Sequence, residues 1–207
     1  MKTALRQASL SSTLSLRLNF VVKRFFDICI SLVAILVSAP FLILLGLIIK
    51  LTSTGSVLYT QKRAGHNGKW FFIYKFRTMR IGADKEDQMI FGKLKNDPRV
   101  TKIGLFLRKY SLDELPQLIN VFLGHMSLVG PRPFIEVEAN TLTTNQQQRL
   151  RVKPGITGYA QIHGRSNLTL KEIIEYDLYY VDNYSLTLDL AIISKTIPYV
   201  LLHKGAY

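Results

Sequence analysis

The longest stretch of the chain without a charged side chain extends from Ile28 to Ile49 and contains 22 residues. As an α-helix with a rise of about 1.5 Å per residue, it would be roughly 33 Å long. The hydrocarbon core of a bilayer is about 30 Å thick. This segment is therefore long enough to enter or cross a membrane, and any fold of the chain has to accommodate it.

Two features of this segment favour a membrane hairpin. Basic residues flank both of its ends, whereas the exported end of a membrane-spanning helix does not attract Lys and Arg. Pro40, which follows Ser38 and Ala39 in the middle of the segment, removes a backbone donor and bends a helix. We therefore expect a re-entrant helix-break-helix hairpin over residues 23–51, with the Ser38 hydroxyl as a local partner for the backbone at the break. A single kinked span is the alternative.

A secretory signal peptide does not fit this segment, because the apolar run is long and Pro40 would directly follow the cleavage site after Ala39. Residues 1–22 are then expected to form a leader, weakly ordered or interfacial, and residues 52–207 a separate domain. The only cysteine, Cys29, lies inside the apolar run, which excludes a disulfide framework and a cysteine-based zinc site.

The composition narrows the class of partner. Twenty-seven Lys and Arg against 14 Asp and Glu give a formal net charge of +13 and a sequence pI of about 9.9. Such an excess favours nucleic acid, a lipid surface or a phosphate-rich substrate. The mean hydropathy of +0.15 is high for so charged a chain, and the sequence has no recognised nucleic-acid-binding motif. We therefore expect a membrane surface and no nucleic acid.

Residues 52–207 are predicted to form an α+β domain with a small β-hairpin. Alternate residues of Trp70–Thr78 form two faces, one of which ends in Lys75 and Arg77, and this pattern predicts a strand. Its expected partner is Val57–Gln61, and the expected turn is Gly65–Gly68. The expected helices are Thr101–Lys109, Glu136–Arg151, Leu170–Val181 and Leu186–Leu202. The last helix carries an apolar stripe, which suits either the core or a membrane interface. The stripe comprises Leu190, Ile193, Ile197, Val200 and Leu201.

An acidic pair, Asp113 and Glu114, interrupts a segment otherwise rich in cations. The spacing of Ser111 and Glu114 predicts a capping box at the start of a helix that Gly124 ends. In that interpretation the acids only stabilise a first turn through the helix dipole. The alternative is chemical, because adjacent carboxylates beside arginines can hold a divalent cation and a phosphate together, as phosphoryl transfer requires. The expected apolar face of this helix comprises Leu112, Leu115, Ile119 and Phe122.

A single arginine, Arg132, stands between Pro131 and Pro133. The two rings restrict the backbone to an extended form, so that little entropy is lost in aiming the guanidinium at phosphate oxygens. An arginine on a rigid surface turn is the plain alternative. A further run, Pro154–Gln161, places two glycines around an aromatic residue and suits either close approach to a ligand or a tight turn. The chain contains no Walker loop, and its histidines show no metal-ligand spacing.

Four motifs in this order resemble those of the bacterial sugar transferases, the monotopic polyprenyl-phosphate phosphoglycosyl transferases. The resemblance extends from about residue 23 to the C-terminus, and the short length is similar to that of the minimal members of the family. The motifs are KFRTM (Lys75–Met79), SLDELPQ (Ser111–Gln117), MSLVGPRP (Met126–Pro133) and PGITG (Pro154–Gly158) followed by Ala160 and Gln161.

The resemblance implies a specific reaction and fold. Members of the family transfer sugar-1-phosphate from a UDP-sugar to undecaprenyl phosphate and release UMP, in a compact domain with interfacial helices on the cytoplasmic face of the bacterial inner membrane. Mg²⁺ is the implied cofactor and would neutralise the diphosphate. The implied nucleophile is Asp113, which would form a covalent aspartyl phosphosugar in a ping-pong mechanism and contact the metal. Glu114 would support Asp113 or its metal.

The resemblance also implies substrate-binding positions and an anchor. Arg108 and Arg132 match the phosphate-binding arginines of the family, and the hairpin with Ser38 and Pro40 at its break matches the membrane anchor. Further positions expected to bind phosphate or substrate are Lys75, Arg77, Pro131, Gly158 and Gln161. Residues that would shape a sugar pocket are Arg165, Asp177 and Tyr180. Anionic membrane lipids are expected partners, whereas a homodimer is left open.

Two other classes of function compete with this interpretation. A nucleic-acid binder would use the positive charge but leaves the apolar run unexplained. A non-catalytic membrane scaffold explains the run and its basic flanks but gives no role to Asp113, Glu114 or Arg132. The sequence does not identify the sugar, for which an N-acetylated amino or diamino sugar is the expectation and glucose and galactose stay open.

Overall fold

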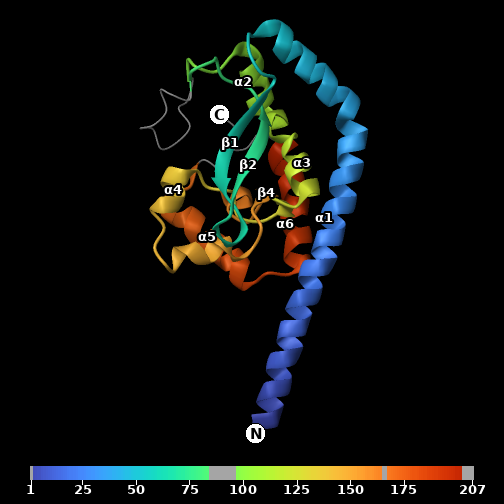
Figure 1. Ribbon diagram of the computed structural model, residues 1–207, viewed down its shortest axis with the longest axis vertical. Coiled ribbons are helices and arrows are strands. Elements are labelled where there is room, and N and C mark those ends of the chain that lie inside the picture. Colours follow the sequence, from blue (N-terminus) through green and yellow to red (C-terminus); the bar gives the residue numbers. More distant parts are fainter. Residues whose placement is uncertain (1, 84–96, 165–166, 202–207) are drawn as a thin grey trace.

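The uncharged run lies within a single helix, α1 (Lys2–Thr52), which passes along one side of the rest of the chain (Figure 1). The computed structural model describes residues 2–83, 97–164 and 167–201, with side chains from Asn19 to Tyr199 within these ranges. The part of α1 from Asn19 to Thr52 is long and apolar enough to cross a membrane, with a mean hydropathy of 2.9 over an 18-residue window that is only 11% buried. Its apolar side chains are therefore available to lipid.

α1 stays helical through Pro40 instead of breaking there. Figure 1 shows that the helix bends before its C-terminal end and that its two arms do not fold back on each other. The bend has a local cause, because Pro40 has no N–H for the preceding turn. The Ser38 hydroxyl donates to the carbonyl of Ala34 at 2.6 Å. The expected hairpin break at Ser38 and Pro40 is thus a bend in a continuous helix, and the expected leader belongs to the same helix.

The predicted β-hairpin is confirmed. β1 (Leu58–Ala64) pairs antiparallel with β2 (Trp70–Phe76), and a 3₁₀ turn from His66 to Gly68 joins them. One face of β2 buries Phe71 and Ile73 against α3. On the other face, Phe76 packs into a second cluster with Leu45 and Ile49 of α1. β2 therefore contacts α3 along one face and the C-terminal part of α1 only at Phe76, while Trp70 and Phe72 on that second face are 39% and 58% exposed.

The segment after the hairpin forms two short helices separated by a tight turn. α2 (Lys102–Lys109) starts at Thr101, whose hydroxyl accepts from the N–H of Gly104 at 3.0 Å, and α3 (Gln117–Leu123) ends at Gly124, which has a φ of 88°. The helix expected to begin at Ser111 begins only at Gln117, because Ser111 has a left-handed φ of 55° and makes no side-chain cap. The predicted capping box is therefore wrong, and Leu112–Glu114 form a single 3₁₀ turn.

The outward face of α3 also differs from the expectation. Leu118 and Val121 are buried, whereas Ile119 and Phe122, on the expected apolar face, are 38% and 40% exposed. Asn120, the one residue between these pairs, is fully buried and hydrogen-bonds to the backbone of β2. The apolar pattern of α3 therefore covers both sides of the helix, and only one of them belongs to the core.

The second half of the domain contains a small parallel sheet and two longer helices. β3 (Ser127–Val129) pairs with β4 (Gly155–Thr157), and α4 (Glu136–Asn140) and a 3₁₀ turn (Gln146–Arg151) replace the single helix predicted for this stretch. α5 (Leu170–Asp182) and α6 (Leu186–Leu201) pack over β3 around Tyr180 and Ile192. On α6, Leu190 and Ile197 of the predicted stripe are 67% and 57% exposed, whereas Ile193 packs against the core. The side chains of Val200 and Leu201 lie outside those that the structure describes.

One stretch of α1 attaches the helix to this domain. Lys23 forms a buried ion pair of 2.6 Å with Asp189 of α6, and the Arg24 guanidinium donates to two carbonyls at the end of α3, at 2.6 and 2.8 Å. The Asp27 carboxylate accepts from a hydroxyl and a backbone N–H of β3, at 3.1 and 2.9 Å. Each of these charged side chains has a hydrogen-bond or ionic partner, as charged groups removed from water require. They connect α1 to three different elements at once.

Candidate functional site

The acidic pair lies in the turn that connects α2 to α3. Ser111 adopts the left-handed region, and Asp113 and Glu114 follow in the 3₁₀ turn that precedes Pro116. A left-handed residue other than glycine is strained, and such strain is common at ligand-binding turns. The turn places the two carboxylates outside a regular helix. They therefore do not cap the first backbone N–H groups of α3.

Cations from two distant segments meet the Glu114 carboxylate. Lys75, at the end of β2 and 39 residues away in sequence, donates from Nζ to Oε1 of Glu114 at 2.7 Å. Both terminal nitrogens of Arg132, 18 residues away, lie 3.3 Å from the same oxygen. The fold thus brings together Glu114, Lys75 and Arg132, three of the side chains that the sequence singled out.

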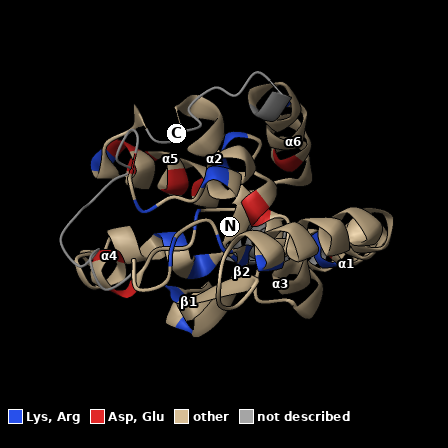
Figure 2. Cartoon of the chain, turned by 90° about the horizontal axis from the view of Figure 1, so that it is seen from above, with Lys and Arg blue, Asp and Glu red and all other residues tan. Residues whose placement is uncertain are grey.

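The electrostatics of this cluster reflect burial and mutual charge. Burial lowers the pKa of Lys75 below the ordinary 10.5 of a lysine, although Glu114 and Asp113 oppose the shift. The Glu114 carboxylate raises the pKa of Arg132, and Asp113 adds to this rise. Because the charge of Asp113 acts on both cations, its carboxylate belongs to the same cluster. Basic positions also gather along the β1–β2 hairpin and the loops beside it (Figure 2), which suits an anionic substrate.

Arg63 of β1 joins the cluster and was not among the expected site residues. Its guanidinium donates to the carbonyl of Pro133 at 3.1 Å and to Gln61 at 2.6 Å, and its Nε is buried with no partner in the described part of the chain. Burial and the charge of Arg132 lower the pKa of Arg63 to about 10. The predicted strand ended at Gln61, two residues short of Arg63, so the alternation of the strand did not place this side chain.

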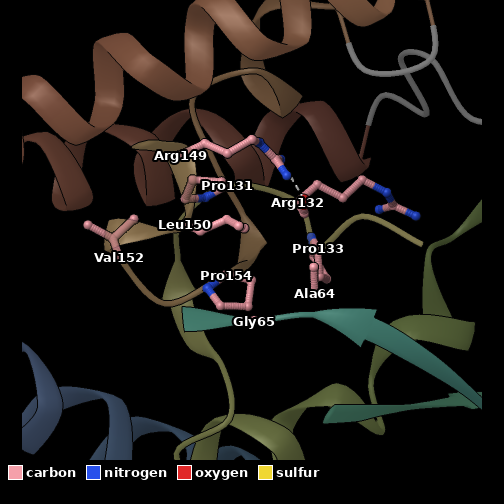
Figure 3. A pocket seen from close by; sticks show the side chains of 9 residues that line it. All are labelled: Ala64, Gly65, Pro131, Arg132, Pro133, Arg149, Leu150, Val152 and Pro154. Atoms are coloured by element: carbon pink, nitrogen blue, oxygen red, sulfur yellow. Dashed lines mark hydrogen bonds between the residues drawn. The ribbon is translucent and has the colours of Figure 1, made fainter. Parts of the chain in front are cut away.

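A buried ion pair supports the backbone of Arg132 from behind. Arg149 donates to the carbonyl of Arg132 at 2.7 Å (Figure 3). Its guanidinium also pairs with Asp177 of α5 at 2.6 Å. Both side chains of the pair are 1% exposed. The cavity beside them, lined by Pro131, Arg132 and Arg149 among others, is about 10 Å³ and has room for about one water molecule. Asp177 is therefore fully buried and, through Arg149, supports the loop Gly130–Pro133 that carries Arg132 (the arginine loop).

The other expected residues lie around this centre or away from it. Arg108 donates to the hydroxyl of Thr78 at 2.9 Å, and Arg77 donates to the backbone and hydroxyl of Ser53 beyond the end of α1, at 3.0 and 2.8 Å. Arg77 therefore ties β2 to the membrane helix. Tyr180 is buried and donates to Asp189 and to a carbonyl of β3. Arg165 lies outside the described residues.

Gly158 and Gln161 lie against the backbone that leads into Pro131 and Arg132. A Cβ at Gly158 would collide with the carbonyl of Gly130, so that only glycine allows this approach. Both polar atoms of the Gln161 carboxamide are buried with no partner among the described residues. An unsatisfied buried amide is costly unless a water or a ligand completes it, which keeps Gln161 a candidate for substrate contact.

The acidic pair has the chemistry of a magnesium site without a complete set of protein ligands. Within the described residues, no group of three or more His, Cys, Asp or Glu side chains converges on one point. Mg²⁺ is commonly held by one or two carboxylates together with water and substrate phosphates. Asp113 and Glu114 supply such carboxylates beside cations that suit a diphosphate. The residues therefore fit a metal that binds together with its phosphorylated substrate.

Comparison with known proteins agrees with this geometry. A family model described as bacterial sugar transferase matches residues 18–203. The exopolysaccharide production protein ExoY of Sinorhizobium fredii is 43% identical over 201 residues, which cover 90% of this chain and 88% of the relative. The UDP-glucose:undecaprenyl-phosphate glucose-1-phosphate transferase of Klebsiella pneumoniae is 41% identical over 92% of this chain and 42% of the relative. The undecaprenyl-phosphate galactose phosphotransferase of Salmonella typhimurium is 38% identical over 96% of this chain and 44% of the relative.

Proposed function

Because this chain belongs to the bacterial sugar transferase family, we propose that it transfers sugar-1-phosphate from a UDP-sugar to undecaprenyl phosphate and releases UMP. The printed functions of the Klebsiella and Salmonella relatives support this substrate pair, and the ExoY relative supports a role in exopolysaccharide synthesis. The observation that carries the proposal is the convergence of Lys75 and Arg132 on the carboxylate next to Asp113. This arrangement supports Asp113 as a nucleophile next to cations that suit a diphosphate.

Asp113 is the proposed nucleophile. An oxygen of its carboxylate attacks the sugar-linked phosphorus of the UDP-sugar, and a new oxygen–phosphorus bond forms as the phosphoanhydride bond breaks. UMP leaves with the bonding electrons of that anhydride. A phosphate oxygen of undecaprenyl phosphate then attacks the same phosphorus and expels the Asp113 carboxylate. Two displacements at one carboxylate avoid bringing two bulky anions together in a single step.

The neighbouring side chains position and neutralise the reacting groups. Lys75 and Arg132 fix the Glu114 carboxylate, and the same cations lie where the substrate diphosphate would approach Asp113. Mg²⁺, held by Asp113 and Glu114, would neutralise part of the diphosphate charge. Arg63 holds the carbonyl of Pro133 and keeps the arginine loop against β1. The site therefore supplies positive charge from rigid elements, which favours displacement at the dianionic diphosphate of the UDP-sugar.

The attachment of α1 supports a monotopic topology with the active site on the cytoplasmic face of the bacterial inner membrane. At one end of the apolar segment, Lys23, Arg24 and Asp27 contact α6, α3 and β3. At the other end, Ser53 accepts from Arg77 of the same domain. A helix that crossed the bilayer would leave its two ends on opposite sides of the membrane. Contacts of both ends with one domain favour entry and exit on one side.

The test of the proposed function is UMP release by the detergent-solubilised chain supplied with Mg²⁺, undecaprenyl phosphate and a panel of UDP-sugars. The panel contains the glucose, galactose and N-acetylated amino sugar derivatives. We expect release with a subset of the panel and a loss of at least about 1,000-fold in Asp113→Asn, as for removal of a covalent nucleophile. Asp182→Asn, at the exposed end of α5, is the matched control and should retain full activity.

Two results would contradict the proposal. UMP release by Asp113→Asn at the wild-type rate would show that the chain is a transferase but that Asp113 is not its nucleophile. If the folded wild-type chain released no UMP with any UDP-sugar of the panel, the non-catalytic scaffold would be the better interpretation. The ping-pong order has its own readout, which is exchange of labelled UMP into the UDP-sugar when undecaprenyl phosphate is absent.

A further inference from the structure

A second cavity lies between α1 and the domain, away from the acidic pair. Its volume is about 330 Å³, which falls in the range of small-molecule sites. None of Lys75, Asp113, Glu114 and Arg132 lines it. Its wall combines charged and aromatic side chains: Lys23, Arg24, Asp27, Lys153, Tyr180 and Tyr184. The proposed transfer reaction therefore gives this cavity no role.

The charges of this cavity are not balanced. Lys23 is paired with Asp189, and the Asp27 carboxylate is satisfied by two donors of β3. Arg24 donates to carbonyls at the end of α3, which carry only the partial charge of a helix terminus. Lys153 makes no hydrogen bond or ion pair with any described residue. Together with Arg24 it outweighs the single Asp27 carboxylate, which leaves the cavity with a net charge of +1.

Lys153 and Arg24 converge on the same point. At Gly124, the position of an ideal Cβ lies 3.1 Å from a terminal nitrogen of Arg24 and 3.5 Å from Nζ of Lys153. Burial and the charge of Arg24 both lower the pKa of Lys153, with only Asp27 acting in the opposite direction. Two cations held together at the edge of a cavity attract an anion, because an anion relieves both their repulsion and their desolvation.

The surroundings identify the kind of anion. Lys23 and Arg24 precede the uncharged run Ile28–Ile49 by about one turn, which places the cavity at the depth of lipid headgroups. The neighbouring α1 side chains Val21 and Phe25 are 67% and 63% exposed and are available to acyl chains. Phe20 stacks on Tyr184 at 4.6 Å and forms an apolar wall between the domain and the helix.

We propose that this cavity binds the phosphodiester headgroup of a monoanionic membrane phospholipid, with Lys153 and Arg24 as its ligands and the acyl chains along the exposed side of α1. The lipid would lie between the membrane helix and the domain and would add to their attachment through Lys23 and Asp27. A monoanionic headgroup matches the net charge of +1 that Arg24, Lys153 and Asp27 give the cavity. The proposal stands independently of the transfer reaction, because it concerns a separate cavity and is tested by binding.

The test is native mass spectrometry of the detergent-solubilised full chain titrated with phosphatidylglycerol or with phosphatidylcholine. We expect one phosphatidylglycerol per chain to be retained, with a Kd about fivefold weaker in Lys153→Gln, as for the loss of one cation at a membrane surface. Lys171→Gln removes the same charge from an 85% exposed position on α5 and should leave the Kd unchanged. Lys153→Arg keeps the charge, should retain binding within about twofold, and controls for folding.

Four outcomes would overturn the proposal. Equal retention of phosphatidylcholine would remove the role of the anionic charge, and equal weakening in Lys153→Gln and Lys171→Gln would indicate general membrane attraction. Displacement of phosphatidylglycerol by millimolar inorganic phosphate would make this a site for a soluble anion. Displacement by stoichiometric undecaprenyl phosphate, weakened in Lys153→Gln, would make it an acceptor site.

Discussion

Glu114 receives two cations from different elements, and this small cluster sets the local chemistry of the site. Lys75 contacts its carboxylate at 2.7 Å with side-chain exposures of 14% and 20%, so that solvent screens the pair only partly. Removing one partner of such a pair leaves the other charge desolvated and unmatched. Replacing either Lys75 or Glu114 therefore also disturbs the charge on Asp113 and Arg132, because all four groups share one environment.

We predict that Lys75→Gln lowers kcat/KM for the UDP-sugar by about 10- to 100-fold, the value of one or two charge-assisted hydrogen bonds. Lys75→Arg should restore most of this loss, because it keeps the charge opposite Glu114. Steady-state UMP release measures the effect. Lys69→Gln, an exposed lysine just before β2, is the control. Equal activity of Lys75→Gln and wild type would show that the ion pair is only structural.

The pH dependence of kcat/KM should reflect the ionisation of Lys75. Burial lowers the pKa of Lys75 below 10.5, and a lysine is charged only below its pKa. The charge, and with it substrate binding, is therefore lost at a lower pH than for an exposed lysine. We predict an alkaline limb in the profile of kcat/KM that begins below pH 10.5 and that Lys75→Arg removes. An unchanged limb in that variant would assign it to another group.

Among the secondary-structure elements, the short helices α2 and α3 carry apolar residues both on the face that packs in the core and on the outward face. The expected apolar face of α3 included Ile119 and Phe122, which are exposed, whereas Val121 is fully buried. α2 likewise exposes Leu105 and Phe106 at 50% and 47%. A soluble domain rarely leaves so much apolar surface in water. We interpret these faces as contacts with the membrane surface, next to α1.

This interpretation predicts an inverted order of stabilities for two neighbouring residues of α3. Val121→Ala should cost about 2 kcal/mol of unfolding free energy, because it leaves a cavity in the core. Phe122→Ala removes a larger side chain but should cost less than Val121→Ala, because the ring faces detergent or lipid. Thermal unfolding in detergent compares the two. A larger loss of unfolding free energy in Phe122→Ala than in Val121→Ala would show that this face of α3 packs in the core.

For the whole molecule, the attachment of α1 decides how the chain meets the bilayer. Its exposed apolar surface runs along one side from Asn19 to Thr52, while Lys23, Arg24 and Asp27 hold it to three elements of the domain. A bent continuous helix fits a shallow insertion, because the bend allows the apolar middle to enter the membrane while both ends stay with the domain. The family relationship and the charge of +13 fit the same surface.

The proposed monotopic topology predicts a specific labelling pattern. In a Cys29→Ala background, Asn19→Cys and Lys69→Cys report the two ends of the apolar segment, one before it and one after it. We expect an impermeant maleimide to leave both cysteines unmodified in right-side-out vesicles and to modify both after permeabilisation. Modification of Asn19→Cys alone in sealed vesicles would show that α1 spans the membrane.

Much of the fold was readable from local sequence. The uncharged run marked the membrane helix, the Gly65–Gly68 turn marked the β-hairpin, and Thr101 and Gly124 marked a helix start and a helix end. Each of these signals depends on residues a few positions apart, because caps, turns and apolar periods are local properties of the backbone. The order of the motifs also identified the family, and the family model confirmed it.

Only the tertiary structure decided which residues form the site and which face of each helix is buried. Ser111 adopts a left-handed conformation in place of a cap, Arg77 contacts the end of α1, and Asp177 supports Arg149 behind the arginine loop. Lys75, Arg63 and Arg132 meet near Glu114 from separate segments. The sequence by itself determined the elements and the chemistry of the chain. Their convergence came from packing between residues far apart in the chain, which no local pattern encodes.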